Sequence, residues 1–154
     1  MKAKEIMHRG VVTVMPLATI TELANILSKH KISGVPVVDN KGNLLGVVSQ
    51  SDIVRKGKHR PEDIPDYYMD VLPLLGSATR RLEEETVFKL MTPAVLSADE
   101  DTPIEDLARQ MLARHIHRIP ITKDKRLTGI VSTIDLLRAF LELSEMQSRA
   151  TKRR

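Results

Sequence analysis

The chain has 154 residues, of which 42% are hydrophobic and 29% are charged, and its formal net charge is +4. This length and composition predict one domain or two small packed halves with a real core, and they exclude disordered and fibrous proteins. The absence of cysteine excludes disulfides and cysteine-ligated metals. No apolar stretch reaches the roughly 18–20 residues that span a bilayer, and the N-terminus lacks a signal-like apolar core. We therefore expect a cytoplasmic protein without membrane contact.

An internal repeat is the most informative feature of the sequence. When Met7 is aligned with Met91, the following residues match in parallel, and after a one-residue gap in a turn Asp52 aligns with Asp135. We predict a first repeat at residues 1–56, a non-repeating insertion at 57–89, a second repeat at 90–148 and a basic tail at 149–154.

Each repeat is predicted to contain the same elements in the same order. An amphipathic helix with apolar residues at i, i+3, i+4 and i+7 starts near Ile20 and near Ile104. A closing helix starts near Ser51 and near Thr133, the second continuing to about residue 148. The predicted strands are 11–14, 35–38 and 44–48, and then 95–97, 119–122 and 127–131. The fold is therefore expected to be α/β of the α+β kind: two β-α-β-β-α repeats packed with pseudo-two-fold symmetry through their sheets.

Local signals add detail at the helix starts and in the insertion. Thr19 with Glu22, and Thr102 with Glu105, predict a capping box at each amphipathic helix. The apolar residues Leu74, Leu75, Ala78 and Leu82 predict one short helix within the insertion. We interpret the insertion as a structured linker, with the capping of a cleft and a dimer contact as alternatives.

A doubled Gly-x-x-Ser-x-x-Asp motif is the main candidate for binding chemistry. It comprises Gly46, Ser49 and Asp52 in the first repeat and Gly129, Ser132 and Asp135 in the second. At a strand-to-helix junction, the carboxylate can accept hydrogen bonds from the vicinal hydroxyls of a ribose, and the glycine lets backbone approach closely. The alternative is a capping box with serine at the N-cap and aspartate at the third helical position. Both interpretations can hold together.

His117 and Arg118 form a second candidate feature, just before a predicted strand. Arginine suits bidentate contact with phosphate, and histidine can add a donor; the alternative is a solvated pair at a strand start. The first repeat has Ser33 and Gly34 at these positions, so the two sites are expected to differ. We find no catalytic motif and no set of metal ligands, and we expect no enzymatic activity.

Taken together, these residues resemble the cystathionine-β-synthase (CBS) domain family in its tandem arrangement, the Bateman module. The resemblance rests on residues 90–93 followed by 95–97, on the segments 32–39 and 116–122 with their central prolines, and on the doubled motif. It implies a regulatory, energy-sensing module without catalysis. AMP, ADP or ATP, or alternatively S-adenosylmethionine or NAD, would bind in clefts between the repeats. It also implies a homodimer and an effector protein of unknown identity.

The resemblance further implies roles for individual residues. Each motif aspartate would hold ribose hydroxyls, and Thr13 and Ser97 would approach the sugar or base of the cleft around the other repeat's aspartate. Backbone near Val35 and Ile119 would line the adenine pocket. The implied nucleotide-binding residues are Asp135, Ser132, Arg118, His117, Ile119, Thr13, Asp52, Ser49, Ser97 and Val35. No metal ligand or required cofactor is expected.

Two alternative functions remain open at this point. One is a dimerising scaffold whose clefts stay empty. The other is a weakly nucleic-acid-associated protein that uses the basic residues 152–154. The chain has only two tyrosines, two phenylalanines and no tryptophan, whereas single-strand binders stack bases on aromatic side chains. Nucleic acid is therefore the less favoured partner.

Overall fold

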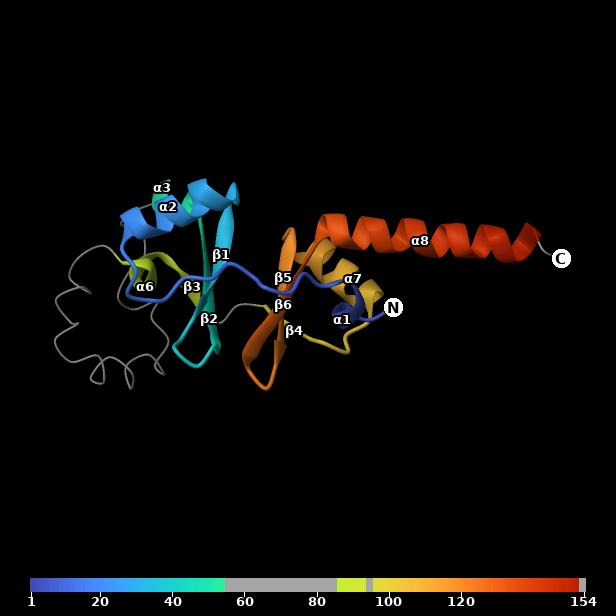
Figure 1. The fold of residues 1–154 in the computed structure, drawn as a ribbon, viewed down its shortest axis with the longest axis horizontal. Coiled ribbons are helices and arrows are strands. Elements are labelled where there is room, and N and C mark those ends of the chain that lie inside the picture. Colours follow the sequence, from blue (N-terminus) through green and yellow to red (C-terminus); the bar gives the residue numbers. More distant parts are fainter. Residues whose placement is uncertain (55–85, 94–95, 153–154) are drawn as a thin grey trace. The chain divides into compact units, whose positions relative to one another are not determined.

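The computed structural model describes residues 1–54, 86–93 and 96–152, and the helix predicted at 74–82 lies outside them. The fold is mixed α+β with two three-stranded sheets, which confirms the predicted class (Figure 1). Among the described residues, no helix has the length and hydropathy needed to cross a membrane. In chain order the elements are α1 (Ala3–Ile6), α2 (Ile20–His30), β1 (Gly34–Val38), β2 (Leu44–Ser49), α3 (Gln50–Val54), α6 (Val87–Leu90), β3 (Thr92–Pro93), β4 (Ala98–Asp99), α7 (Ile104–Arg114), β5 (Arg118–Lys123), β6 (Arg126–Ser132) and α8 (Thr133–Lys152).

The chain forms two compact units that are assembled differently from the two sequence repeats. Unit 1 comprises Met1–Val11 and Leu96–Arg154, and unit 2 comprises Val12–Val95. We call Met1–Val11 the first leading segment and residues 86–93 the second. In Figure 1 the dark-blue α1 accompanies the orange elements of unit 1, and the yellow-green α6 and β3 accompany the blue and cyan elements of unit 2. Each leading segment thus belongs to the unit built by the body of the other repeat.

Unit 2 contains an antiparallel sheet in the order β1-β2-β3, and β3 comes from the second leading segment. The amphipathic pattern of α2 buries Leu23 and Leu27 against strand valines and against Val87 from α6. The predicted capping box of α2 is confirmed: the Glu22 amide donates to Thr19 Oγ1 at 3.1 Å, and the Thr19 amide donates to Glu22 Oε2 at 2.8 Å.

The β1–β2 hairpin is closed by hydrogen bonds to one aspartate. Asp39 accepts hydrogen bonds from the Lys41 amide and from both the amide and the side chain of Asn43, each at 2.9 Å. Burial alone would raise the pKa of Asp39, but these hydrogen bonds outweigh it and the pKa is lowered. Gly42 supplies the positive φ of 83° that the turn requires.

Unit 1 contains a sheet in the order β4-β5-β6, with β4 parallel to β5 and β5 antiparallel to β6. Its core gathers Ile104, Leu107 and Ile119 with Ala3 and Met7 from the first leading segment. Asp124 and Lys125 close the β5–β6 hairpin with positive φ values of 49° and 68°. Two left-handed residues in succession are typical of the turn that matches strand twist.

The capping box predicted for α7 from Thr102 and Glu105 is wrong. The helix begins at Ile104, its N-cap is Pro103 in an extended conformation, and no side chain caps it. Tertiary pairing explains the difference, because the Ala3 amide donates to the Thr102 carbonyl at 2.8 Å and the Ile104 amide donates to the Met1 carbonyl at 3.1 Å. The first leading segment therefore holds the residues before α7 in an extended conformation.

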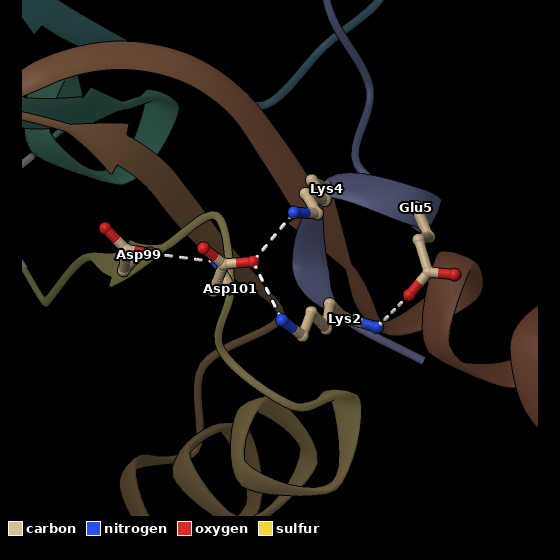
Figure 2. A network of polar contacts seen from close by, with 5 residues as sticks. All are labelled: Lys2, Lys4, Glu5, Asp99 and Asp101. Atoms are coloured by element: carbon tan, nitrogen blue, oxygen red, sulfur yellow. Dashed lines mark hydrogen bonds and ion pairs between the residues drawn. The ribbon is translucent and has the colours of Figure 1, made fainter.

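A polar network on the surface also ties the first leading segment to unit 1 (Figure 2). Asp101 Oδ1 accepts from Lys2 Nζ at 3.0 Å and from Lys4 Nζ at 2.8 Å. The hydrogen bonds from Lys4 and Lys2, with their charges, lower the pKa of Asp101 to about 2. The same contact raises the pKa of Lys4.

Candidate functional site

In unit 2, the motif residues lie where β2 passes directly into α3. Asp52 Oδ2 accepts hydrogen bonds from the Ser49 amide at 2.8 Å and from Ser49 Oγ at 3.0 Å. Ser49 Oγ is also 2.8 Å from Ser51 Oγ. All three side chains therefore form one connected polar group at the end of the strand.

The equivalent residues of unit 1 lie where β6 passes into α8. Asp135 Oδ2 accepts from the Ser132 amide at 2.8 Å and from Ser132 Oγ at 2.6 Å, and the Asp135 amide donates back to Ser132 Oγ at 3.3 Å. This reciprocal pair has the hydrogen bonds of a capping box, with aspartate at the third helical position. The capping interpretation of the motif therefore holds in the structure.

The ligand-binding interpretation is compatible with this geometry. In both units, every hydrogen bond that the motif aspartate accepts from the described residues goes to Oδ2. Both aspartates are also only partly buried. Oδ1 of Asp52 and Oδ1 of Asp135 are therefore the acceptors that a ligand hydroxyl could use.

Strand pairing places different residues beside the two motif serines. Arg118 is directly opposite Ser132 in the β5–β6 ladder, whereas Gly34 is directly opposite Ser49 in the β1–β2 ladder. The carbonyl of His117 accepts from the Thr133 amide at 3.0 Å and from Thr133 Oγ1 at 3.2 Å. This contact fixes the start of β5 against the start of α8, so the His117–Arg118 pair and the Ser132/Asp135 pair meet at one end of the sheet.

The motif glycines have a different role from the one expected. A Cβ atom on Gly46 would lie 2.6 Å from the Thr92 carbonyl oxygen, and one on Gly129 would lie 2.6 Å from Met7 Sδ. The glycines therefore make room for the leading segments. The segments that lie close to these two glycines are parts of this chain and not a ligand.

The remaining predicted residues occupy varied environments. Val35 and Ile119 are 2% and 0% exposed, and their side chains belong to the cores of units 2 and 1. Thr13 is half-buried in the unit that carries Asp52, and Ser97 is exposed in the unit that carries Asp135. His117 and Arg118 are both exposed.

Two hydroxyl residues at these junctions were missed by the sequence analysis. Ser51 contacts the motif serine in unit 2, and Thr133 contacts the His117 carbonyl in unit 1. The sequence feature that could have identified them is a hydroxyl residue one or two positions after each motif serine, where a side chain lies close to the end of the preceding strand. Within the described part of the chain, no cluster of three His, Asp or Glu side chains could hold a metal ion.

Comparison with known proteins identifies relatives along nearly the whole chain. A family model described as CBS domain matches residues 3–59 and 87–142. An uncharacterized protein of Methanocaldococcus jannaschii is 32% identical over 155 residues, covering 92% of each chain. CBSX1, a chloroplastic CBS domain-containing protein of Arabidopsis thaliana, is 31% identical over 97% of this chain and 65% of its own length.

Other relatives are much longer, and the solved structures extend the comparison to the fold. Inosine-5'-monophosphate dehydrogenase of M. jannaschii is 31% identical over 140 residues, and the chain spans only 23% of its length. A structure of CBSX2 in complex with AMP has a TM-score of 0.72 and 25% identity, covering 93% of this chain and 98% of that one. The CBS domain pair of protein MJ0100, in complex with 5'-methylthioadenosine and S-adenosyl-L-methionine, has a TM-score of 0.67 and 28% identity, covering 91% and 95%.

Proposed function

The chain belongs to the CBS domain family, and from this premise we propose that it is a regulatory module that binds an adenosine-containing ligand and has no catalytic activity. One observation carries the proposal: in each unit the motif serine occupies one oxygen of the motif aspartate and leaves the other unused by the described residues. The AMP complex of CBSX2 and the S-adenosyl-L-methionine complex of MJ0100 support this ligand class.

The proposed binding chemistry follows from the groups at each junction. Oδ1 of Asp52 or Asp135 accepts hydrogen bonds from ribose hydroxyls, and a charged acceptor makes the stronger bonds. Arg118 contacts the ligand phosphate and His117 adds a donor. Ser49, Ser132, Thr13 and Ser97 contribute polar contacts to the sugar or base. Val35 and Ile119 take part through backbone only, because their side chains are buried in the cores.

The regulatory part of the proposal concerns what ligand binding changes. A ligand shifts a conformational equilibrium only if it binds one arrangement more tightly than another. We propose that AMP, ADP or ATP is the natural ligand, which would make the module a sensor of cellular energy, and that an effector protein in the cytoplasm responds to the change. S-adenosylmethionine and NAD are the alternative ligands.

We also propose a homodimer that forms through α8. Leu136 and Ala139 pack into the core of unit 1, whereas Ile134, Leu137 and Leu141 point away from it and are 58%, 58% and 66% exposed. This outer apolar stripe on a regular helix suits a second copy. Leu137→Glu is expected to convert a dimer to a monomer in light scattering, whereas Gln147→Glu on the same helix is expected to leave the mass unchanged.

Isothermal titration tests the ligand proposal directly. The wild-type protein is titrated with AMP, ADP, ATP, S-adenosylmethionine and NAD, alongside Asp135→Asn and the control Asp106→Asn. Asp106 is an exposed aspartate of the same unit that pairs with Arg109. We expect saturable binding of one of these ligands, weakened about tenfold or more in Asp135→Asn because a charge-assisted hydrogen bond is lost, and unchanged in Asp106→Asn. An absence of saturable heat with all five ligands would contradict the proposal.

A further inference from the structure

The two hairpins are closed by side chains of different charge. In unit 2 the residues at the base of the turn are Asp39 and Asn43, and Asp39 accepts hydrogen bonds from the amide and from the side chain of Asn43, each at 2.9 Å. In unit 1 the equivalent residues of the repeat are Lys123 and Arg126, which are directly opposite each other in the β5–β6 ladder. Like charges directly opposite in a ladder are destabilising. A stabilising pair in one hairpin is therefore replaced by a repulsive pair in the other.

The turn of the unit 1 hairpin adds a third cation in an unfavourable position. Lys125 has a φ of 68°, in the left-handed region that glycine adopts without steric cost and that other residues adopt uncommonly. Residues 123–126, which we call the basic tip, are all exposed, and they combine three cations with Asp124. Local stability alone would favour glycine at position 125 and an uncharged pair at the base of the turn. Departures of this kind from local preference are expected where a protein has a functional surface.

The chain does not neutralise these cations within its described part. Among the described residues, none of the three cationic side chains of the basic tip forms an ion pair. Acidic residues that follow β4 lie at the same end of the sheet, because Asp99 is in register with Thr122 of β5. Two of these carboxylates are already engaged, as Figure 2 shows: Asp101 accepts from the lysines of the first leading segment, and Asp99 accepts from the Asp101 amide at 2.9 Å. The cations of the basic tip are therefore available to a partner molecule.

The basic tip is separate from the Ser/Asp junction of the same unit. In the β5–β6 ladder, Arg118 is opposite Ser132 at one end and Lys123 is opposite Arg126 at the other. At the usual rise per strand residue, the two ends of β5 are about 16 Å apart. The side chains of the basic tip therefore form a second surface, outside the site proposed for the adenosine-containing ligand.

We propose that the basic tip is a docking surface for an acidic segment of a partner protein, in which closely spaced aspartate or glutamate side chains contact Lys123, Lys125 and Arg126. Arginine can bind a carboxylate through two parallel hydrogen bonds, and the two lysines on the same turn can bind a second carboxylate. Because this surface lies outside the proposed ligand site, its role does not depend on the proposed function.

The residues of the basic tip favour a protein over other polyanions. Single-strand binders stack bases on aromatic side chains, and neither the basic tip nor the half-buried Thr122 and Leu127 that flank it offer one. A site that lies on a membrane surface combines cations with exposed apolar side chains, whereas all four residues of the basic tip are charged. Three cations on one short turn match a short cluster of carboxylates better than an extended phosphate backbone.

Fluorescence anisotropy with a labelled hexaglutamate peptide tests the proposal. The tip variant combines Lys123→Gln, Lys125→Gln and Arg126→Gln. A charge-matched control replaces three exposed cations elsewhere in the chain by glutamine: Lys29, Lys41 and Arg149. We expect the peptide to bind the wild-type protein and the control within about twofold of each other, and the tip variant about tenfold or more weakly, because three ion pairs are lost. Raising the salt concentration from about 50 to about 200 mM should weaken binding to the wild-type protein severalfold.

A single variant separates binding from folding. Lys125→Gly removes the steric cost of the positive φ, so the urea midpoint of the protein is expected to rise. The same variant removes one cation from the basic tip, and peptide binding is expected to weaken about threefold. A lower urea midpoint with unchanged peptide binding would mean that Lys125 supports the turn, and its assignment to the docking surface would be overturned.

Other outcomes would also overturn the docking surface. One is an absence of hexaglutamate binding to the wild-type protein. Another is an equal loss of affinity in the tip variant and the control, because net charge alone would then explain binding. Tighter binding of oligothymidylate or of phosphatidylserine vesicles than of the peptide, lost in the tip variant, would assign the basic tip to a nucleic acid or to a membrane.

Ligand binding distinguishes a failure of this proposal from a failure of the proposed function. The tip variant is expected to bind the adenosine-containing ligand of the wild-type protein within about twofold, because the two surfaces are well separated. A wild-type protein that binds hexaglutamate but none of the five ligands would contradict the proposed function and leave the docking surface supported.

Discussion

Units 1 and 2 contain the same sequence motif in the same place, yet they differ around it. Both have an amphipathic helix of 11 residues that ends in a left-handed residue, Lys31 or His115, each with φ 52°. Both have a hairpin that leads to a Ser/Asp junction. The residue opposite the motif serine is glycine in one unit and arginine in the other. Core positions are constrained by packing and stay alike in the two units. The positions opposite the motif serines, at the end of each hairpin, differ in chemistry.

The leading segments differ in a similar way. The first is fixed to unit 1 by backbone pairing and by the Lys2–Asp101 and Lys4–Asp101 ion pairs. The second is fixed to unit 2 by backbone pairing, with the Val87 amide donating to the Ala18 carbonyl at 2.9 Å. The repeat position equivalent to Asp101 is Leu17, which carries no charge. Within the described residues, ion pairs therefore support the placement of the first leading segment in unit 1 and none is found for the second leading segment in unit 2.

Deleting residues 1–7 is the strongest test of whether the first leading segment belongs to unit 1. The deletion removes Ala3 and Met7 from the core of unit 1, and we expect unit 1 to lose about 3–5 kcal/mol of its free energy of unfolding. Hydrogen exchange should show faster exchange in β5 and β6, which lie far from the deletion in sequence, with little change in β1 and β2. Deleting residues 149–154 is the control. Unchanged protection of β5 and β6 would show that the first leading segment does not contribute to the core of unit 1.

Alanine at the two motif glycines should reveal how rigid each leading segment is. At Gly46 the new Cβ meets the backbone carbonyl of Thr92, whereas at Gly129 its nearest neighbours at 2.6 and 2.8 Å are side-chain atoms of Met7. We expect Gly46→Ala to cost about 2–3 kcal/mol and Gly129→Ala about 1–2 kcal/mol in urea unfolding.

A double-mutant cycle distinguishes the two cases. Met7→Ala should offset part of the cost of Gly129→Ala, because the flexible side chain is the main obstacle. Met91→Ala should offset less of the cost of Gly46→Ala, since the Thr92 carbonyl stays in place. Equal coupling in the two cycles would mean that the leading segments pack on the two glycines in the same way.

Serine-to-alanine variants compare the two junctions as helix caps. Ser132 both donates to Asp135 Oδ2 and accepts from the Asp135 amide, so Ser132→Ala should cost about 1 kcal/mol. Ser49→Ala should cost about half of that, because Ser49 Oγ donates to Asp52 Oδ2 but its second contact is the exposed Ser51 hydroxyl and not a helix amide. Ser148→Ala, whose hydroxyl bonds the Ser144 carbonyl on exposed α8, should change stability by less than about 0.5 kcal/mol.

Acid pH should loosen the first leading segment more than the second. The folded-state pKa of Asp101 is about 2, below its ordinary value of 3.8, because Lys4 and Lys2 donate to it. A depressed carboxyl pKa contributes stability that is present above the unfolded-state pKa and is lost as pH falls through the folded-state pKa, here between about 4 and 2. The effect is small because all three side chains are exposed to solvent.

A carboxyl-detected NMR titration of Asp101 checks this prediction. The titration midpoint should move up toward the ordinary aspartate value in the Lys2→Ala/Lys4→Ala variant. Asp101→Asn should abolish the dependence on acid pH of amide hydrogen exchange in residues 2–8. A midpoint near 3.8 in the wild-type protein would show that the ion pairs do not form in solution.

Much of the fold followed from local patterns in the chain. Both hairpins, both amphipathic helices, the Thr19 cap and the strand-to-helix junctions were predicted, because periodicity and turn residues act over a few neighbouring positions. The Thr102 cap failed because contacts with Met1 and Ala3, about a hundred residues away in the chain, decide where α7 begins. Ser51 was missed because its contact with Ser49 depends on rotamers that the sequence does not specify.

By itself, the sequence determined the repeat, the class of fold, and the Ser/Asp junctions. Only the tertiary structure decided which unit each leading segment joins, what fills the space above Gly46 and Gly129, and which residue faces each motif serine. The physical reason is that the two repeats present similar strand edges and similar helix starts, so either edge could pair with either segment by local preference alone. Long-range backbone pairing and packing of Met7 and Met91 resolve that choice.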